Sequence, residues 1–249
     1  MNALITGGTG GIGFFMAKEL LKKGYDVFLI SRNIGRTDEL IKEFPDRKVY
    51  FFSHDLSRED EYYHLLLEIN NIPFEVFVSN AGFGDIGKYE DTDIQKEISM
   101  VKLNDISTLI LVKSFMERFK EQGRGRILVT CSAASFGVAP YMNVYYATKA
   151  FSYSLVHGYH RELRMEKSQV TISALCPGPV KTDFGKTANV KLSKNAMLPE
   201  KVAEVAVNGI LKGKLEIVPG FKMKLVHFLS HLVPKRLISC FLNKSAEME

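Results

Sequence analysis

Ser132, Tyr145 and Lys149 are polar residues whose types and spacing could carry out proton transfer. If residues 145–149 open a helix, Tyr145 and Lys149 share one face and lie about 6 Å apart along the axis. A tyrosine hydroxyl has a pKa near about 10, and an adjacent ammonium group favours the phenolate and lowers that pKa. With a serine hydroxyl to hold a substrate oxygen, the set predicts general acid–base catalysis of carbonyl reduction or alcohol oxidation.

A glycine-rich run near the N-terminus could position a cofactor for that chemistry. The apolar stretch 2–6 leads into residues 6–13, Thr-Gly-Gly-Thr-Gly-Gly-Ile-Gly, and an amphipathic segment follows up to Gly24. Strand, glycine turn and helix form the context of a dinucleotide-binding fingerprint, in which backbone N–H groups approach a pyrophosphate. The run fits both GxGxxG and TGxxxGxG, and we favour the second because it agrees with the Tyr145/Lys149 pair.

Together with further segments in a fixed order, these motifs resemble the short-chain dehydrogenase/reductase family over nearly the whole chain. The resemblance implies an α/β fold, a single Rossmann-type doubly wound domain over residues 1–249, with a seven-stranded parallel sheet in the order 3-2-1-4-5-6-7. The matching segments are residues 6–13, Asp55-Leu56, Asn80-Ala81-Gly82, Asn104, Ser132, Tyr145 with Lys149, and Pro177-Gly178-Pro179-Val180-Lys181-Thr182.

The same resemblance implies roles for individual residues. Tyr145 would be the acid/base, Lys149 would lower its pKa and hold the nicotinamide ribose, Ser132 would bind the reacting oxygen, and Asn104 would anchor a water in a proton relay. Asp55, Leu56 and residues 80–82 would lie along the adenine, and Val180 and Thr182 near the nicotinamide. The full set expected to bind cofactor is Thr6, Gly7, Thr9, Gly11, Ile12, Gly13, Ser31, Arg32, Asp55, Leu56, Asn80, Ala81, Gly82, Tyr145, Lys149, Pro177, Gly178, Val180 and Thr182.

Some of these positions have competing interpretations. Tyr146 also reaches the face of Lys149, and Ser135 is a second hydroxyl, but Ser132 with Tyr145 alone gives both the family's gap and its YxxxK spacing. Asn104 could instead cap a helix, since asparagine favours that position. Asp55 could cap a helix starting near residue 58, and Thr182 could be a turn residue.

The end of the second predicted strand indicates which cofactor is bound. Folds selective for NAD place a carboxylate about 20 residues past the glycines to accept from the ribose 2′-OH. Here Ser31 and Arg32 occupy that place, with Arg36 close by, and Asp26 comes too early. A guanidinium binds a 2′-phosphate well, so the sequence predicts NADP(H) rather than NAD(H).

Alternating apolar runs and helical patterns predict the remaining elements. Strands are expected at residues 2–6, 26–31, 48–53, 75–80, 125–132, 170–176 and 215–219. Runs such as Val27-Phe28-Leu29-Ile30 are apolar throughout, as in parallel strands covered on both faces. Helix starts are expected at Ser57, at Thr92 or Asp93, and at Pro199.

Composition fits one α/β domain that acts on small molecules. The chain has 249 residues, 46% of them hydrophobic, and a net charge of +5 without a basic aromatic stripe, which argues against nucleic acid. The three cysteines are widely spaced and form no CxxC motif, and we expect Cys131 and Cys176 to be buried and reduced. We also recognise no leader or membrane-spanning segment, so the sequence predicts a cytoplasmic protein. The six histidines show no metal-ligand spacing.

Two segments are expected to complete the site. Residues 181–198 would form a substrate lid, with Phe184 and Leu192 near the substrate. Residues 221–249 form a basic, amphipathic extension interrupted by Pro234, which we expect to fold against the body at the cleft mouth or a subunit contact, membrane contact being the less favoured alternative. The family resemblance also implies a homodimer or homotetramer through helices near 105–122 and 145–166.

The sequence thus predicts an NADP(H)-dependent carbonyl reductase or alcohol dehydrogenase. The substrate class stays open among fairly apolar carbonyls: an acyl thioester, a steroid-like ketone, a sugar derivative or an aldehyde. The alternatives are a non-catalytic NADP-binding sensor on the same fold, which the intact tetrad argues against, and an epimerase or dehydratase, for which the chain is short.

Overall fold

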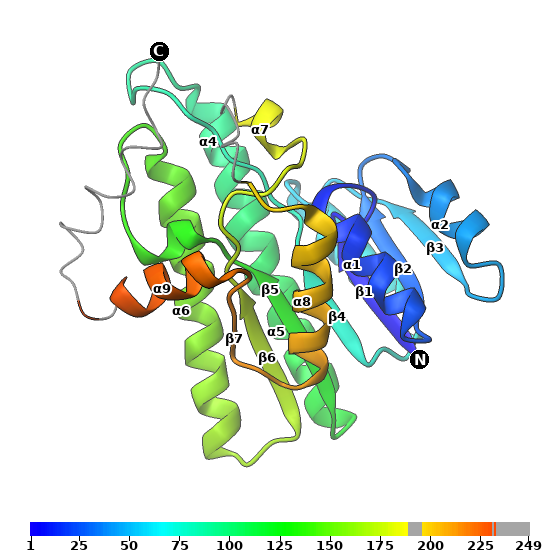
Figure 1. Cartoon of the computed structure of the whole chain (residues 1–249). Helices are drawn as coiled ribbons and strands as arrows, with labels where there is room; N and C mark the ends of the chain where they lie inside the picture. The colour runs from blue at the N-terminus through cyan, green and yellow to red at the C-terminus, as the bar shows by residue number, and fades with distance from the viewer. Residues whose placement is uncertain (189–195, 231, 233–249) are drawn as a thin grey trace.

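Short apolar runs along the chain form the strands of one parallel sheet. The computed structural model describes residues 1–188, 196–230 and 232 (Figure 1). In this part of the chain the sheet has seven strands in the order β3-β2-β1-β4-β5-β6-β7, which confirms the predicted fold class and strand order. The strands are β1 (Asn2–Thr6), β2 (Asp26–Ser31), β3 (Val49–Ser53), β4 (Val76–Ser79), β5 (Gly125–Thr130), β6 (Val170–Leu175) and β7 (Glu216–Ile217).

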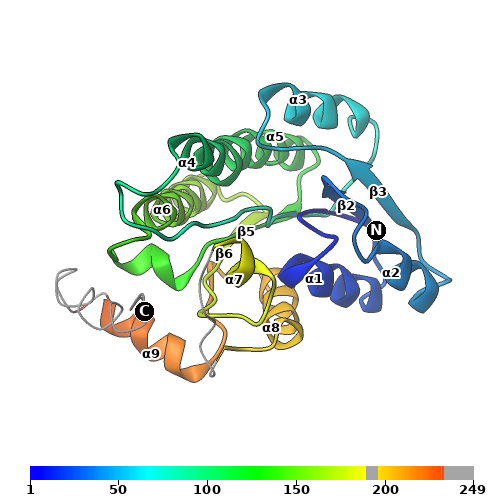
Figure 2. The same cartoon turned by 90° about the horizontal axis from the view of Figure 1, so that it is seen from above.

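Helices cover both faces of the sheet. In Figure 2, α3, α4, α5 and α6 lie on one face, and α1, α2 and α8 lie on the other. The helices are α1 (Gly11–Lys22), α2 (Thr37–Glu43), α3 (Glu59–Glu68), α4 (Ile94–Val101), α5 (Ser107–Glu121), α6 (Asn143–Met165), α7 (Phe184–Thr187), α8 (Pro199–Leu211) and α9 (Phe221–Ser230), with a π-helical turn at Lys102–Ile106 and a 3-10 turn at Ala133–Phe136.

The sheet separates two hydrophobic cores. Within β1, Leu4 packs with the side chains of α3, α5 and α6, whereas Ala3 and Ile5 pack with those of α1 and α8. Successive strand residues point to opposite faces, so a strand with a core on each side must be apolar at every position. This explains why the buried strands read as continuous apolar runs rather than as alternating ones.

The predicted element boundaries agree best where side chains change from apolar to polar. β1 and β2 have the predicted bounds, and the other strands are one to three residues shorter at one or both ends. Asp93 caps α4, its carboxylate accepting from Gln95 N at 2.9 Å, and Pro199 is the first residue of α8. Ser57 is not the cap of α3, which begins at Glu59 after Arg58, so that expectation was wrong by one residue.

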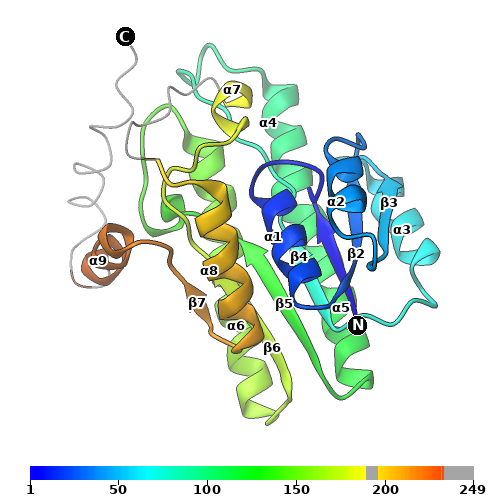
Figure 3. The same cartoon turned by 45° about the vertical axis from the view of Figure 1, so that its right-hand side comes forward.

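The last strand and α9 close one end of the sheet (Figure 3). β7 pairs only with β6 among the described strands. Met223 of α9 reaches Gly178, where a Cβ would lie 2.8 Å from its sulfur, and His227 packs on Phe136 with ring centroids 4.6 Å apart. His227 Nε2 also lies 3.2 Å from Glu216 on β7. The start of the tail therefore packs against the body, and most of the rest of the predicted segment lies outside the described residues.

The turn between β1 and α1 depends on glycine at two positions. Gly7 has φ +64°, a backbone conformation that side chains disfavour. At Gly13 a Cβ would lie 2.1 Å from the carbonyl oxygen of Gly7 and 2.6 Å from Asn80 Nδ2. The first turn of α1 thus packs directly on the backbone of the glycine loop.

Replacing Gly13 by alanine should destabilise the protein, because the added methyl group forces α1 away from the loop. We expect the free energy of unfolding to fall by about 1–3 kcal/mol, the usual cost of overpacking. Gly10→Ala is the matched control, since a Cβ there meets nothing within 4 Å; it should change stability by less than about 0.5 kcal/mol. Urea denaturation checks both, and equal losses would contradict this role of Gly13.

Candidate active site

Side-chain hydrogen bonds join the carboxyl ends of three neighbouring strands. The hydroxyl of Thr6, at the end of β1, accepts from the backbone N–H groups of Asn80 (2.9 Å) and Ala81 (3.0 Å) after β4. Asn80 Nδ2 donates to the carbonyls of Thr6 and Gly7, and its Oδ1 accepts from the Thr130 hydroxyl of β5 at 3.1 Å. The glycine loop and the Asn-Ala-Gly segment are thus fixed to each other.

The four predicted catalytic residues come together beside Gly82. A Cβ at Gly82 would lie 2.9 Å from Asn104 Oδ1 and 3.6 Å from Lys149 Nζ. Lys149 Nζ lies 5.8 Å from the centre of the Tyr145 ring. Tyr145 in turn interacts with the side chain of Ser132. Residues that follow β4 and β5 and residues of the π-helical turn and α6 therefore meet beyond the carboxyl ends of these two strands.

The hydrogen bonds around Lys149 distinguish the roles of the two candidate hydroxyls, Ser132 and Ser135. Lys149 donates from Nζ to the carbonyl of Thr130 at 2.9 Å, which holds the ammonium group at the end of β5. Ser135 donates to the carbonyl of Lys149 at 2.8 Å and receives the N–H of Ser132 at 3.4 Å. The Ser135 hydroxyl therefore supports the backbone around the site, whereas the Ser132 side chain interacts with Tyr145.

Asn104 lies within a continuous helical segment rather than at a helix start. Its Oδ1 accepts from Phe83 N at 3.1 Å, and its Nδ2 donates to Phe83 O and to the Thr148 hydroxyl at 2.9 and 3.1 Å. Thr148 donates to the carbonyl of Tyr145 at 2.8 Å. The alternative of a capping asparagine is therefore wrong. Single-turn π segments occur frequently at functional sites, and this one directs Asn104 toward α6.

Burial controls the proton affinities of Tyr145 and Lys149. Desolvation raises the pKa of Tyr145 to about 12, although the interaction with Ser132 works in the opposite direction. Desolvation also lowers the pKa of Lys149, because a buried ammonium group loses its hydration. The expectation that Lys149 depresses the tyrosine pKa below its usual value is therefore not met in this arrangement.

Asp105 is a buried acid near the site that the sequence did not single out. It is 9% exposed, and its Oδ1 has no hydrogen-bond partner among the described residues. Burial raises its pKa to about 7, and the positive charge of Lys149 opposes that shift. One feature could have indicated this buried acid: Asp105 is a single carboxylate on a helix face that is otherwise buried against α6.

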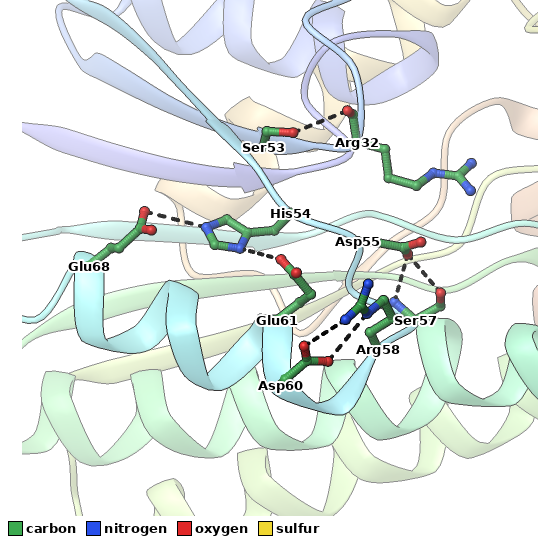
Figure 4. Close-up of polar contacts among 9 residues, drawn as sticks. All are labelled: Arg32, Ser53, His54, Asp55, Ser57, Arg58, Asp60, Glu61 and Glu68. Carbon is green, nitrogen blue, oxygen red and sulfur yellow. Dashed lines mark hydrogen bonds and ion pairs between the residues drawn. The ribbon is translucent and has the colours of Figure 1, made fainter.

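The predicted adenine side of the site lies at the ends of β2 and β3 (Figure 4). The Ser53 hydroxyl donates to the backbone carbonyl of Arg32 at 3.2 Å, and the Arg32 guanidinium extends from the fold with no bond to the other residues drawn. Asp55 accepts from the N–H and the hydroxyl of Ser57 at 3.1 and 2.7 Å. It therefore stabilises a turn ahead of α3 instead of capping the helix.

Arg36 is less available than the sequence suggested. Its guanidinium binds Glu39 through two hydrogen bonds of 2.8 and 2.7 Å and lies 3.9 Å above the Phe14 ring. Assistance from Arg36 in cofactor binding would require both contacts to break. Arg32 therefore remains the better candidate for a phosphate contact.

The Pro-Gly-Pro segment reaches the glycine loop from the opposite side. Ala133 N donates to the carbonyl of Pro177 at 2.9 Å, Val180 forms a parallel bridge with Met197, and Thr182 lies beside Gly11, whose Cβ would be 3.8 Å away. Phe184 follows with its ring centroid 5.4 Å from that of Tyr145. Leu192 lies outside the described residues.

One side-chain group has the geometry of a metal site but is engaged otherwise. Ligand atoms of Asp60, Glu61 and His64 on α3 lie within 4.8 Å of one another. Asp60 forms an ion pair with Arg58 at 2.8 Å, and Glu61 binds His54 at 2.8 Å (Figure 4). This group lies on α3, whereas Tyr145 and Lys149 lie on α6, so it is separate from the predicted catalytic residues.

Comparisons with known proteins agree with this geometry. A family model described as short chain dehydrogenase matches residues 1–212. The chain belongs to the short-chain dehydrogenase/reductase family. It is therefore related to oxidoreductases, and within its described residues no helix is both long and apolar enough to cross a membrane.

Several relatives and solved structures resemble the chain along most of its length. A very-long-chain 3-oxoacyl-CoA reductase-like protein of Arabidopsis thaliana is 28% identical, covering 95% of this chain and 78% of its own. Estradiol 17-beta-dehydrogenase 11 of Mus musculus is also 28% identical, covering 94% and 80%. A short-chain dehydrogenase from Sphingobium yanoikuyae in complex with NADPH has the same fold, with a TM-score of 0.84, 23% identity and coverage of 96% and 95%.

Replacing Asp105 by asparagine should alter how stability depends on pH. The raised pKa means that the unfolded chain releases this proton first, so the wild type loses stability as the pH rises from about 4 to about 7. Asparagine keeps the shape without the charge. Relative to wild type, the variant should gain on the order of 3–4 kcal/mol between about pH 4 and about pH 8.

Urea denaturation at the two pH values measures this difference. Asp91→Asn, at an exposed position, gives the effect of losing one surface carboxylate. Parallel stability curves for wild type and Asp105→Asn would show that Asp105 does not titrate in this range.

Proposed function

We propose that the chain is an NADP(H)-dependent oxidoreductase that transfers hydride between nicotinamide C4 and a carbonyl carbon, with the corresponding secondary alcohol as the reduced form. The observation that carries the proposal is the meeting of Asn104, Ser132, Tyr145 and Lys149 beside Gly82. A phenol, a hydroxyl and an ammonium group converging there provide an acid, an oxygen ligand and a positive charge.

The glycine loop fits the proposed dinucleotide. A Cβ at Gly10 would meet no atom within 4 Å, so there is open space beside this residue. The twelve-residue helix α1 begins at Gly11 without a side-chain cap. Free N–H groups at a helix N-terminus bind phosphate oxygens well. The nicotinamide would supply or accept the hydride. Tyr145 and Lys149 of α6 would face the nicotinamide from one side, and Thr182, which lies beside the glycine loop, would face it from the other.

The protonation state of Tyr145 suits the reductive direction. With a pKa of about 12 the phenol keeps its proton at neutral pH, and reduction needs a proton donor beside the carbonyl oxygen. Ser132 would hold that oxygen next to the phenol. After transfer, the Lys149 ammonium would stabilise the phenolate, and Asn104 would orient a water that returns a proton to it.

A fairly apolar carbonyl is the proposed substrate. Phe184 adds an aromatic ring beside Tyr145, and Met223 of α9 reaches the Pro-Gly-Pro segment. The names of the two relatives, a very-long-chain 3-oxoacyl-CoA reductase-like protein and an estradiol dehydrogenase, also denote large apolar substrates. A cytoplasmic location agrees with the free, buried thiols of Cys131 and Cys176.

We also propose that the protein forms a homodimer or homotetramer through α5 and α6. The support is a shallow groove along the outer face of α6, about 380 Å³ in volume. Its apolar side chains recur at helical spacing, which suits packing against another helix. The groove is lined by Phe151, Ser154, Leu155, Gly158, Tyr159 and Glu162.

Tyr145→Phe should remove the proton donor while leaving cofactor binding intact. General acid–base groups contribute about 10²–10⁴-fold, so kcat for NADPH-dependent reduction of an accepted carbonyl should fall by that factor. A library of carbonyl compounds, screened by NADPH absorbance, identifies the substrate. Tyr146→Phe is the neighbouring control and should stay close to wild type. Full turnover in Tyr145→Phe would refute the role of Tyr145 as the proton donor. No turnover of the wild type with any carbonyl would refute the reductase proposal and favour a cofactor-binding sensor.

Arg32→Ala should weaken NADPH binding far more than NADH binding, since only NADPH has a 2′-phosphate. Loss of a charge-assisted hydrogen bond costs about 1.5–3 kcal/mol, so the Kd for NADPH should rise by one to two powers of ten. Ser31→Asp should shift the preference toward NADH. Fluorescence titration with both cofactors measures this, with Arg36→Ala as the control. Equal losses for NADPH and NADH would exclude a phosphate contact by Arg32.

A further inference from the structure

Helix α9 carries an exposed apolar stripe on the side that faces away from the body. Four large side chains of α9 recur at positions i, i+4, i+7 and i+8, which places them within an arc of about 100° at 3.6 residues per turn. A fifth large exposed side chain, Leu232, follows the helix in the chain. Their exposed fractions are Phe221 83%, Leu225 50%, Phe228 61%, Leu229 44% and Leu232 67%.

The opposite side of the same helix is already occupied. Met223 contacts Gly178, and His227 contacts Phe136 and Glu216. These contacts fix how α9 is rotated about its axis. The packing of the inner face therefore holds the apolar stripe outward, and α9 does not lie loosely on the surface.

Two lysines border the stripe on its two sides. At 3.6 residues per turn, Lys222 falls just beyond one edge of the arc and Lys224 just beyond the other. Both are exposed. No Asp or Glu occurs between Glu216 and Glu247, whereas this stretch contains Lys222, Lys224, Lys235, Arg236 and Lys244. The lysines of α9 therefore have no acidic residue beside them on the helix itself.

We propose that the outer face of α9 is a peripheral membrane contact that binds anionic phospholipid. An apolar stripe with one lysine on each side matches the boundary between acyl chains and acidic headgroups, where lysine stems lie along the apolar layer and their ammonium groups reach the phosphates. This inference adds a lipid contact to the packing of the inner face, and it does not depend on the proposed reductase activity.

A second copy of the chain fits this face less well. A ten-residue helix is about 15 Å long, and its outer face offers only part of the about 800 Å² per partner that a stable dimer needs. The flanking lysines would also face their own counterparts across a symmetric contact, which repels. Residues 233–249 are the other candidate occupant, and the experiment distinguishes them.

Vesicle flotation at physiological salt tests the proposal with the full-length protein. The probes are vesicles of phosphatidylcholine alone and of phosphatidylcholine with roughly one third phosphatidylserine. We expect flotation with the acidic vesicles only. Phe221→Ser/Phe228→Ser should weaken binding by at least about tenfold, because each substitution removes a phenyl ring that would be buried in the acyl layer. Lys222→Glu/Lys224→Glu should weaken it by more than about tenfold through loss of attraction and added repulsion.

Matched variants elsewhere on the surface control for general effects. Leu67→Ser/Tyr89→Ser removes two side chains of similar exposure, 74% and 82%. Lys212→Glu/Lys214→Glu reverses two exposed lysines at the same spacing. Both should float like wild type, and all four variants should keep the wild-type melting temperature.

Three results would overturn the proposal. The first is wild-type protein that does not float with acidic vesicles. The second is flotation of Phe221→Ser/Phe228→Ser as strong as that of the wild type. The third is flotation only after truncation behind Leu232, which would mean that residues 233–249 cover the stripe. Reductase activity on a soluble carbonyl, measured in the same samples, is independent of all three outcomes.

Discussion

The ammonium group of Lys149 constrains everything around it, because a charge buried at the edge of a protein core must find polar partners. The carbonyl of Thr130 provides one, at 2.9 Å. That bond exists because β5 ends at Thr130, where the strand leaves its ladder and a carbonyl oxygen becomes available. The position of Tyr145, one helical turn earlier on α6, follows from the same anchor. The end of one strand thus fixes two of the predicted catalytic groups.

Neutral and charged groups around this cation affect one another. Burial makes Lys149 easier to deprotonate and Asp105 easier to protonate, whereas the opposite charges of the two groups stabilise each other and act against both shifts. Tyr145 stands in the same poorly hydrated region and keeps its proton. A site of this kind can change its proton distribution with small changes in surroundings, which is the property that acid–base catalysis needs near neutral pH.

The sequence predicted the sheet well because its strands have cores on both faces, and the two apolar runs at β1 and β2 end at polar residues that also end the strands. It did not predict the π-helical turn that holds Asn104, because such a turn results from the fit between α4, α5 and α6 and has no local sequence pattern. The pKa of Tyr145 was also missed, since desolvation depends on distant residues. Spacing predicts which side chains meet, whereas only the folded surroundings determine their proton affinity.

The two cores on either side of the sheet have a consequence for how substitutions combine. Leu4 contacts one set of helices, and its neighbours Ala3 and Ile5 contact another. Residues that share packing partners are coupled in their effects on stability. Leu4 and its neighbour Ile5 belong to different cores, whereas Leu4 and Phe115, far apart in sequence, belong to the same one. Epistasis in this protein should follow the faces of the sheet and not the order of the residues.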